Sequence, residues 1–231
     1  MKRLDAILLA CSAVCMFIAL YMVFIWSPIE VKMGAVQKIF YIHVSSAWVS
    51  FLAFFVVFIC SLLVIWKSNE LAYHVAGASA EIGVVFTAIV LTTGPIWARS
   101  AWNTWWTWEP RLTTTLILFF MYIGYLLLRQ SDGERHKVAR FSSAFGLVAF
   151  INVPIVFMAI RWWNSRLHPV VFGDGKNQKG GGVEPEMLFT LIVCVVAMTL
   201  LYAVLVRKGV RIARMKEKVK MYMEQVYTHF S

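Results

Sequence analysis

Charged side chains are scarce in this sequence. Asp, Glu, Lys and Arg make up 15% of the 231 residues, whereas 60% of the residues are hydrophobic. A soluble protein of this length needs about 25% charged residues to cover its surface. The composition therefore excludes an ordinary soluble domain and indicates a membrane-embedded chain. The net charge of +10 comes from basic residues between apolar runs and near the C-terminus. That placement favours lipid contact over nucleic-acid binding.

Several motifs of redox proteins and nucleotide-binding proteins are also missing. The four cysteines lie inside apolar runs and form neither a C-x-x-C pair nor the C-x-x-C-H motif of a c-type cytochrome. No G-x-x-x-x-G-K-[ST] loop for ATP binding occurs. We therefore expect buried structural thiols and no ATPase activity.

Long apolar runs dominate the sequence instead. A helix that crosses a membrane needs about 20 mainly apolar residues. Six segments qualify, namely residues 4–26, 39–66, 72–96, 112–128, 138–163 and 187–206. We predict an all-α polytopic membrane protein with six transmembrane helices. Gly94-Pro95 is expected to end the third span, and Pro154 to kink the fifth. Glu81 is a functional candidate, because a carboxyl group within a span is costly unless it is protonated and bonded to a neighbouring helix.

The distribution of Lys and Arg predicts the orientation of the spans. With a cytoplasmic N-terminus, fourteen of these cations lie inside and eight outside, so we expect both termini inside. We divide the chain into a transmembrane domain, residues 1–206, with an outer Trp-rich loop at 97–111, and a basic cytoplasmic tail, residues 207–231. The tail is either a solvated extension of the sixth span or an amphipathic segment that lies on anionic lipid.

The predicted loop after the third span is unusually rich in tryptophan. Half of the ten Trp residues fall in it: Trp97, Trp102, Trp105, Trp106 and Trp108. A belt of aromatic residues at the membrane surface explains one or two of them. A broad apolar shelf for a large planar ligand explains the whole cluster, and we favour this interpretation. If the segment were helical, Trp102, Trp105 and Glu109 would share one face.

Two histidines are expected on the same side as this loop. His43 follows the outer start of the second span, and His168 follows the outer end of the fifth. They are either structural residues at helix ends or a pair of axial ligands to an iron porphyrin. Arg99 and Arg111 either mark the water boundary or pair with carboxylates of a ligand. Glu109 can hydrogen-bond an indole or an arginine and so shape the loop.

These segments resemble a known family. Residues 102–109 read W-N-T-W-W-T-W-E, which resembles the W-G-x-W-W-x-W-D signature of the heme-handling proteins of cytochrome c maturation (the WWD domain). Residues 39–48 and 152–168 resemble the two histidine regions of that superfamily. The resemblance covers about residues 4–206, and the number of spans is similar to that of its heme exporter protein C family. Asn103 and Glu109 depart from the signature, which has Gly and Asp there; Asn tolerates a left-handed backbone better than most residues.

The resemblance implies a function, a cofactor and partners, and a protein that is not an enzyme. Heme b would bind non-covalently at the outer face, with His43 and His168 as the axial ligands of its iron and the Trp-rich loop around it. The heme would pass to a periplasmic membrane-anchored heme chaperone. ABC-type transporter subunits of the cytochrome c maturation complex are further implied partners, and a small membrane subunit is another candidate. The expected location is the bacterial cytoplasmic (inner) membrane, with several spans in the lipid bilayer and both termini cytoplasmic.

Two alternative functions stay open at this point. A cytochrome c heme lyase or synthase of the same superfamily carries the Trp signature but is larger, with more spans and more histidines. A membrane b-type electron carrier would place facing histidine pairs deep in the bilayer. Six spans and two outer histidines favour heme handling over both.

Overall fold

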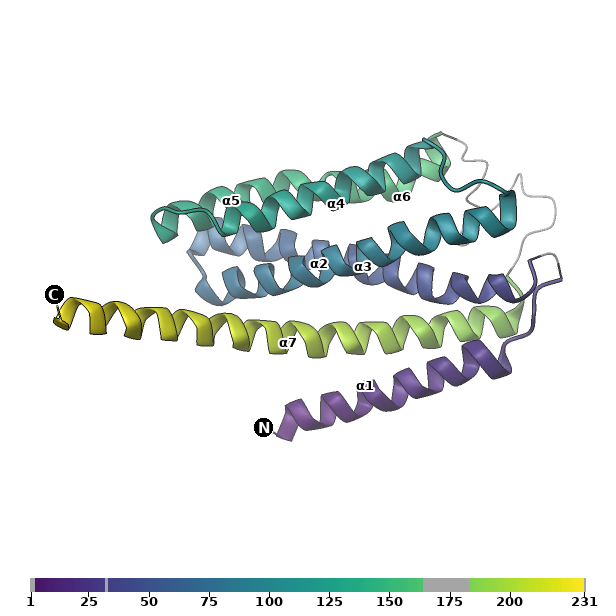
Figure 1. Cartoon of the computed structure of the whole chain (residues 1–231), viewed down its shortest axis with the longest axis horizontal. Coiled ribbons are helices and arrows are strands. Elements are labelled where there is room, and N and C mark those ends of the chain that lie inside the picture. Colours follow the sequence, from purple (N-terminus) through teal and green to yellow (C-terminus); the bar gives the residue numbers. More distant parts are fainter. Residues whose placement is uncertain (1–2, 32, 164–182, 231) are drawn as a thin grey trace.

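The computed structural model describes residues 3–31, 33–163 and 183–230. These residues form an elongated bundle of helices that run side by side (Figure 1). The helices are α1 Arg3–Tyr21, α2 Ile39–Lys67, α3 Glu70–Trp102, α4 Pro110–Arg129, α5 Arg135–Phe150, α6 Asn152–Trp162 and α7 Pro185–Phe230. A π-helical turn, Met22–Trp26, extends α1, and a 3-10 turn, Ala35–Lys38, precedes α2.

Six helical stretches are long and apolar enough to cross a membrane. The first consists of α1 and its π-helical turn, and the fifth consists of α5 and α6 together. The second joins the 3-10 turn to α2, and the other three are α3, α4 and most of α7. The prediction of an all-α multi-pass membrane protein is therefore confirmed.

The bundle has two distinct ends. The N- and C-termini both lie toward one end, which we call the terminal end, and α7 extends beyond the start of α1 there (Figure 1). The connection from α3 to α4 lies at the opposite end, which we call the loop end. Helices α2 and α3 pack along each other at the centre; α4, α5 and α6 cover one side, and α7 covers the other. Helix α1 packs against the outer side of α7.

Aromatic side chains fill the core between α2 and α4. Phe54 stacks on Tyr122 with ring centroids 3.6 Å apart. Tyr125 is fully buried in the same cluster. Close packing of this kind fixes the helices relative to one another.

The predicted end of the third span is wrong. Helix α3 continues through Gly94-Pro95 to Trp102. A proline removes a single backbone hydrogen bond, and membrane helices tolerate this where neighbouring groups compensate. The helix ends instead at Asn103, whose φ of 57° and ψ of 29° are left-handed. A residue in this conformation is a common helix terminator, and Gly or Asn is preferred there.

The segment after Asn103 is not helical, so the idea that Trp102 and Trp105 share a helical face with Glu109 is also wrong. Trp102 is the last residue of α3, and the chain is irregular until α4 begins at Pro110. Glu109 is the residue just before α4. Proline at the first helical position fits because its missing N–H would have no helical partner there.

The fifth span is interrupted close to Pro154, where the sequence predicted a kink. Helix α5 ends at Phe150, and α6 begins at Asn152. Pro154 lies in the first turn of α6. Its ring nitrogen carries no hydrogen for the Phe150 carbonyl, which accounts for the interruption at this point. The Asn152 side chain donates to the Thr114 carbonyl at 2.9 Å and ties α6 to α4.

Helix α7 is 46 residues long and continues without a break through the predicted tail. The tail is therefore a helical extension of the last span, and its contact with water or with lipid stays a prediction. The domain boundary after residue 206 matches no change in backbone structure and stays a prediction. Gly209 lets α7 approach α3 closely, since a Cβ atom there would lie 2.8 Å from Cβ of Ala78.

Candidate functional site

A pocket opens at the loop end between α2, α3 and α4. Its walls are mostly apolar and aromatic, and it holds a cavity of about 120 Å³. Arg111 at the start of α4 is the one Arg, Lys, Asp or Glu among the described residues that line it. Of the predicted site residues, the pocket brings together His43, Trp97, Trp102, Trp106 and Arg111. This loop-end pocket is the candidate ligand site.

The hydrogen bonds of Thr93 favour one tautomer of His43. The Thr93 hydroxyl donates to the Ile89 carbonyl at 2.6 Å, as hydroxyl groups in helices often do. Its Oγ1 therefore accepts the bond of 2.9 Å that joins it to Nδ1 of His43. With Thr93 as the acceptor, Nδ1 carries the hydrogen and the lone pair lies on Nε2. Imidazoles that ligate metals use this arrangement, in which the second nitrogen donates to an outer partner.

The absence of a side chain at Gly94 leaves space for the His43 ring. A Cβ atom at residue 94 would lie 3.3 Å from Cε1 of His43, closer than most such contacts. Glycine therefore allows the ring to rest against α3. The next residue, Pro95, also lines the pocket. The Gly-Pro pair that was expected to end the span instead forms part of the site.

Tryptophan side chains form one wall of the pocket. The Trp97 ring lies 6.1 Å from the His43 ring and 5.9 Å from the Trp102 ring, measured between centroids. Nε1 of Trp97 donates to Sδ of Met33 at 3.3 Å. Trp97 is thus held in position beside the histidine.

Two buried polar atoms at the pocket have no hydrogen-bond partner among the described residues. They are Nε1 of Trp106 and Oγ1 of Thr107. Leaving such a group unpaired costs about 1–3 kcal/mol. A ligand with acceptor atoms would satisfy both, so these atoms fit a site that holds a polar-edged ligand.

The remaining residues of the predicted Trp shelf lie outside the pocket lining. Trp108 is 75% exposed, although its ring lies 5.8 Å from that of Trp106. Arg99 sits 6.0 Å from the Trp105 ring and donates to the Asn103 carbonyl at 3.1 Å. It also donates to Oδ1 of Asn103 at 2.5 Å. In this structure Arg99 therefore holds the turn that ends α3.

The second predicted iron ligand, His168, lies outside the described residues, so its pairing with His43 stays a prediction. Glu81 is exposed on α3 and lines neither the loop-end pocket nor the cavities at the terminal end.

The side chains of the pocket match the chemical groups of a porphyrin, but the cavity is large enough to enclose only part of the porphyrin. Binding pockets for small organic molecules usually measure about 300–1,000 Å³, more than this cavity of about 120 Å³. A heme bound here would lie partly outside the enclosed space. An imidazole nitrogen, flat indole faces and a single arginine are nevertheless the groups that iron, a porphyrin ring and a propionate each require.

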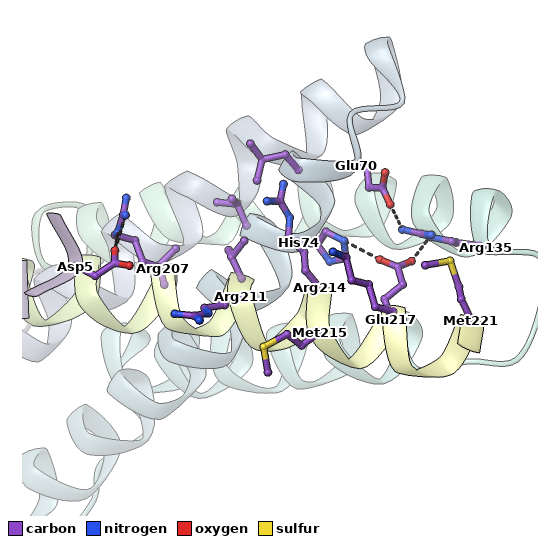
Figure 2. A pocket seen from close by; sticks show the side chains of 15 residues that line it. Asp5, Glu70, His74, Arg135, Arg207, Arg211, Arg214, Met215, Glu217 and Met221 are labelled. Atoms are coloured by element: carbon purple, nitrogen blue, oxygen red, sulfur yellow. Dashed lines mark hydrogen bonds and ion pairs between the residues drawn. The ribbon is translucent and has the colours of Figure 1, made fainter. Parts of the chain in front are cut away.

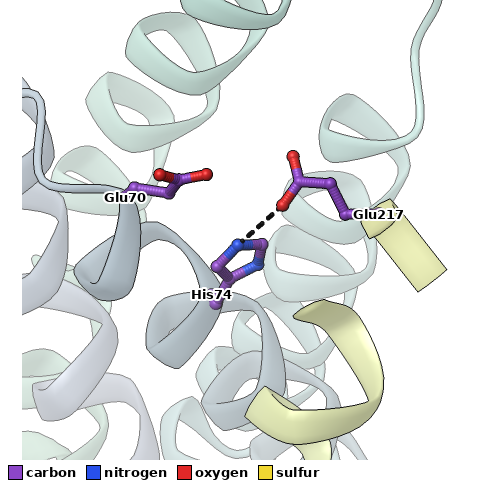
Figure 3. Close-up of side chains that lie close together, drawn as sticks. All are labelled: Glu70, His74 and Glu217. Atoms are coloured by element: carbon purple, nitrogen blue, oxygen red, sulfur yellow. Dashed lines mark ion pairs between the residues drawn. The ribbon is translucent and has the colours of Figure 1, made fainter. Parts of the chain in front are cut away.

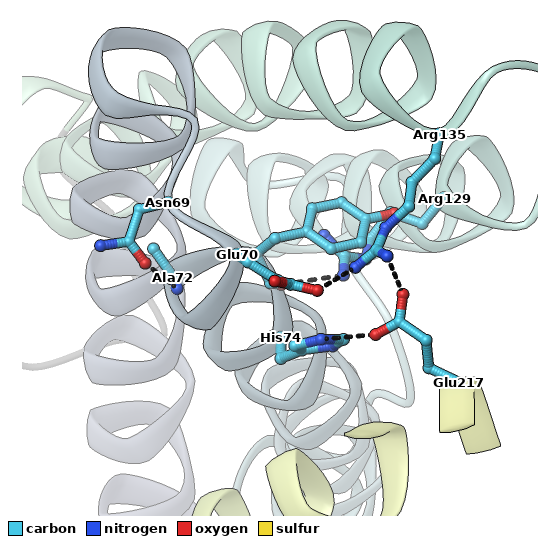
Figure 4. A network of polar contacts seen from close by, with 8 residues as sticks. Asn69, Glu70, Ala72, His74, Arg129, Arg135 and Glu217 are labelled. Atoms are coloured by element: carbon cyan, nitrogen blue, oxygen red, sulfur yellow. Dashed lines mark hydrogen bonds and ion pairs between the residues drawn. The ribbon is translucent and has the colours of Figure 1, made fainter. Parts of the chain in front are cut away.

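The terminal end holds a charged network that the sequence analysis missed. Nε2 of His74, which is 6% exposed, lies 3.0 Å from Oε2 of Glu217 (Figure 3). The Arg135 guanidinium pairs with the other oxygen of Glu217 and, at 2.7 Å, with Glu70 (Figure 4). The network joins α3, α5 and α7. Asn69 caps the start of α3 beside it, accepting from the Ala72 amide at 2.9 Å.

This network resembles a metal site in composition. One ligand atom from each of Glu70, His74 and Glu217 lies within 4.8 Å of the others. Arg135 bonds to both carboxylates, however, and so supplies the positive charge that a metal would bring. We regard the network as a set of ion pairs that holds α3, α5 and α7 together. The sequence contained one signal for it, because Glu217 is the single acidic residue among the basic residues 207–220.

Comparison with known proteins gives consistent matches. The heme exporter protein C family matches residues 1–225. A heme exporter protein C from Bradyrhizobium diazoefficiens is 35% identical over 195 residues, which cover 84% of this chain and 73% of the relative. A putative cytochrome c biosynthesis ccmC-like mitochondrial protein from Marchantia polymorpha is 32% identical, over 72% of this chain and 69% of the relative. The heme exporter protein C of Escherichia coli is 30% identical, over 70% and 64%.

The match extends over nearly the whole chain and includes all six helical stretches that can cross a membrane. The chain therefore belongs to the heme exporter protein C family.

Proposed function

We propose that this protein handles heme for cytochrome c maturation and binds it as cargo at the loop-end pocket. The observation that carries the proposal is His43. It lines a pocket walled by tryptophan, and the contact of its Nδ1 with Thr93 favours the tautomer with the lone pair on Nε2. The names of the relatives, heme exporter protein C and a cytochrome c biosynthesis protein, support the same conclusion.

Each residue of the pocket has a role in this proposal. His43 is one axial ligand of the heme iron, and His168 is the second, as the sequence predicts. Trp97, Trp102 and Trp106 contact the porphyrin ring, because flat indole faces bury a large apolar area against it. Arg111 pairs with a propionate in the geometry that arginine favours for carboxylates.

The rest of the Trp-rich loop forms the rim of the site. Trp105, Trp108, Arg99 and Glu109 lie outside the pocket lining, where a receiving protein can contact them. In this proposal heme b is held without a covalent bond and passes to a membrane-anchored heme chaperone in the periplasm. The protein acts as a carrier and assembly component in the inner membrane with both termini cytoplasmic, beside ABC-type transporter subunits and a small membrane subunit. We infer no enzymatic activity of its own.

The test is the visible spectrum of the protein purified from heme-replete cells. Two axial histidines predict a six-coordinate, low-spin heme. His43→Gly and His168→Gly should each lower the amount of bound heme, and imidazole in the medium should partly restore it by filling the vacant position. His136→Gly, at an exposed residue at the start of α5, is the control. Full heme content in the double variant His43→Gly/His168→Gly would rule out ligation by these residues.

A further inference from the structure

A wide groove runs along α7 at the terminal end, on the side that faces α3. Its cavity measures about 1050 Å³. Figure 2 shows the ion pair of Asp5 with Arg207 at one end of the groove and the network of His74, Glu217 and Arg135 at the other. The groove is separate from the loop-end pocket and shares no lining residue with it.

The three carboxylates of the groove are all engaged by cations. Asp5 accepts two hydrogen bonds from Arg207, at 3.0 and 2.5 Å. Arg135 bonds to both Glu70 and Glu217, and His74 bonds to the second oxygen of Glu217. The three carboxylates thus already have partners within these two networks, where Glu70 and Glu217 share Arg135.

Three further cations line the groove: Arg211, Arg214 and Lys218. They are spaced i, i+3 and i+7, so they share one face of α7. No carboxylate of the described residues forms an ion pair with any of them. The five Arg and Lys residues of the groove outnumber its three Asp and Glu residues by two. The groove therefore carries excess positive charge on one side.

The groove also lies where a membrane surface is expected. It starts at Val206 and Arg207, where the apolar run of α7 gives way to basic residues. Leu71, Val75 and Val210 line it as well. A second cavity of about 300 Å³ lies on the other side of Arg207 and Arg211, between α1 and α7. Charged and apolar linings thus meet at the boundary between lipid and water.

We propose that this groove binds the headgroup of an anionic phospholipid, with its phosphate held by Arg211, Arg214 and Lys218. Arginine pairs with phosphate through two parallel hydrogen bonds, and basic pockets between membrane helices suit anionic headgroups. The apolar lining favours a lipid over a soluble phosphate compound, because the glycerol backbone and the start of the acyl chains need apolar contacts. His74 and Glu217 position α7 beside the phosphate rather than touching it.

The test measures which lipids stay with the full-length protein. The protein is placed in nanodiscs of phosphatidylcholine with a minority of phosphatidylglycerol, extracted, and its retained lipids are quantified by mass spectrometry. The wild type should enrich phosphatidylglycerol at least about fivefold over the nanodisc ratio, since each basic residue near an anionic surface contributes about 1 kcal/mol. Retention at the nanodisc ratio by the wild type would overturn the proposal without any variant.

Two triple variants separate the groove from general charge. Arg211→Gln/Arg214→Gln/Lys218→Gln should lose the enrichment. Lys67→Gln/Lys216→Gln/Lys220→Gln removes the same charge at exposed residues that do not line the groove, and it should keep the enrichment within about twofold. Equal loss in both variants would show that surface charge alone recruits the lipid. Circular dichroism of both variants checks that the bundle is intact.

One further measurement identifies the source of the phosphate, and a second variant replaces the triple Gln variant if that variant does not fold. Inorganic phosphate or glycerol 3-phosphate should not displace the retained phosphatidylglycerol at millimolar concentration. Displacement would assign the groove to a soluble phosphate compound and contradict the proposal. If the triple Gln variant does not fold, Arg211→Lys/Arg214→Lys keeps the charge and removes the paired hydrogen bonds; it should lower the enrichment, and full enrichment would count against the arginines. Heme content reports on the loop-end pocket separately.

Discussion

The loop-end pocket and the terminal-end groove are formed by the same bundle but differ in almost every physical property. The pocket is narrow and aromatic, and Arg111 is the one Arg, Lys, Asp or Glu in its described lining. The groove is several times larger, and eight Asp, Glu, Arg and Lys residues line it. Two buried polar atoms of the pocket lack partners among the described residues, whereas every carboxylate of the groove has one.

The difference shows how each end is suited to another kind of ligand. The pocket offers indole faces, an imidazole and two unpaired polar atoms, which suit a flat ligand with few polar groups. The groove offers spare positive charge beside an apolar lining, which suits the headgroup of a lipid. Variants at one end should therefore leave the other end unaffected, and four predictions test this separation.

Trp106→Ala should have the largest effect and only at the loop end. A tryptophan side chain buries up to about 150–250 Å², and even half of that area is worth about 2 kcal/mol against a ligand. We expect heme affinity to fall about 30-fold, measured by heme titration of the purified protein. Trp108→Ala is the matched control, since Trp108 is 75% exposed and does not line the pocket. Equal losses in the two variants would mean that the whole loop, not the pocket, binds heme.

Glu217→Ala should act at the terminal end. It leaves the buried His74 without its partner and removes one of the two carboxylates of Arg135. We expect a loss of about 2 kcal/mol in stability, seen as a lower unfolding temperature and faster proteolysis of the α7 extension. Glu134→Ala removes an exposed ion pair with Lys137 and should change neither. Reduced heme affinity in the Glu217 variant would show that the two ends are coupled.

Thr93→Val tests the tautomer of His43. Valine keeps the shape of threonine and removes the oxygen that accepts from Nδ1. Losing the group that accepts a hydrogen bond from a metal-binding histidine typically lowers the affinity of the site about 10-fold or more. Heme affinity should therefore fall about 10-fold. Thr92→Val is the control, because the Thr92 hydroxyl donates only to carbonyls of its own helix. Unchanged heme binding in both variants would remove Thr93 from the proposed site.

Gly94→Ala should have the smallest effect. The added Cβ atom would lie 3.3 Å from Cε1 of His43, so the ring must shift by a few tenths of an ångström. We expect heme affinity to fall about threefold, because metal ligands tolerate only small displacements. The same substitution at Gly124 meets Phe145 at an ordinary distance of 3.8 Å and should be silent. Lipid retention in the groove should be unchanged in both variants.

Much of the site could be predicted from the sequence, because its elements are local. The Trp-rich loop, His43 and Arg111 lie near the ends of apolar runs whose order places them on one side of the membrane. The structure brings His43 and Arg111 into one pocket with three of the five tryptophans. The end of α3 was missed, since a Gly-Pro pair usually stops a helix and here lies within it.

The terminal end was far less predictable. His74 and Glu217 are separated by most of the chain, and periodicity does not indicate which faces of α3 and α7 meet. Their contact depends on how closely Gly209 lets α7 approach Ala78 and on the unbroken course of α7 past the last span. The one signal in the sequence was Glu217, the single acidic residue in a basic stretch. Nothing in the sequence indicated that His74 is its partner.

The sequence by itself determined the six spans, the helical class and the side of the bundle on which the tryptophans and His43 lie. Apolar length and the order of spans depend on composition along the chain, which needs no knowledge of packing. Tertiary structure alone decided which tryptophans line the pocket, which nitrogen of His43 contacts Thr93, and which cations of α7 line a groove. These features depend on contacts between side chains of different helices, and such contacts exist only once the helices have packed.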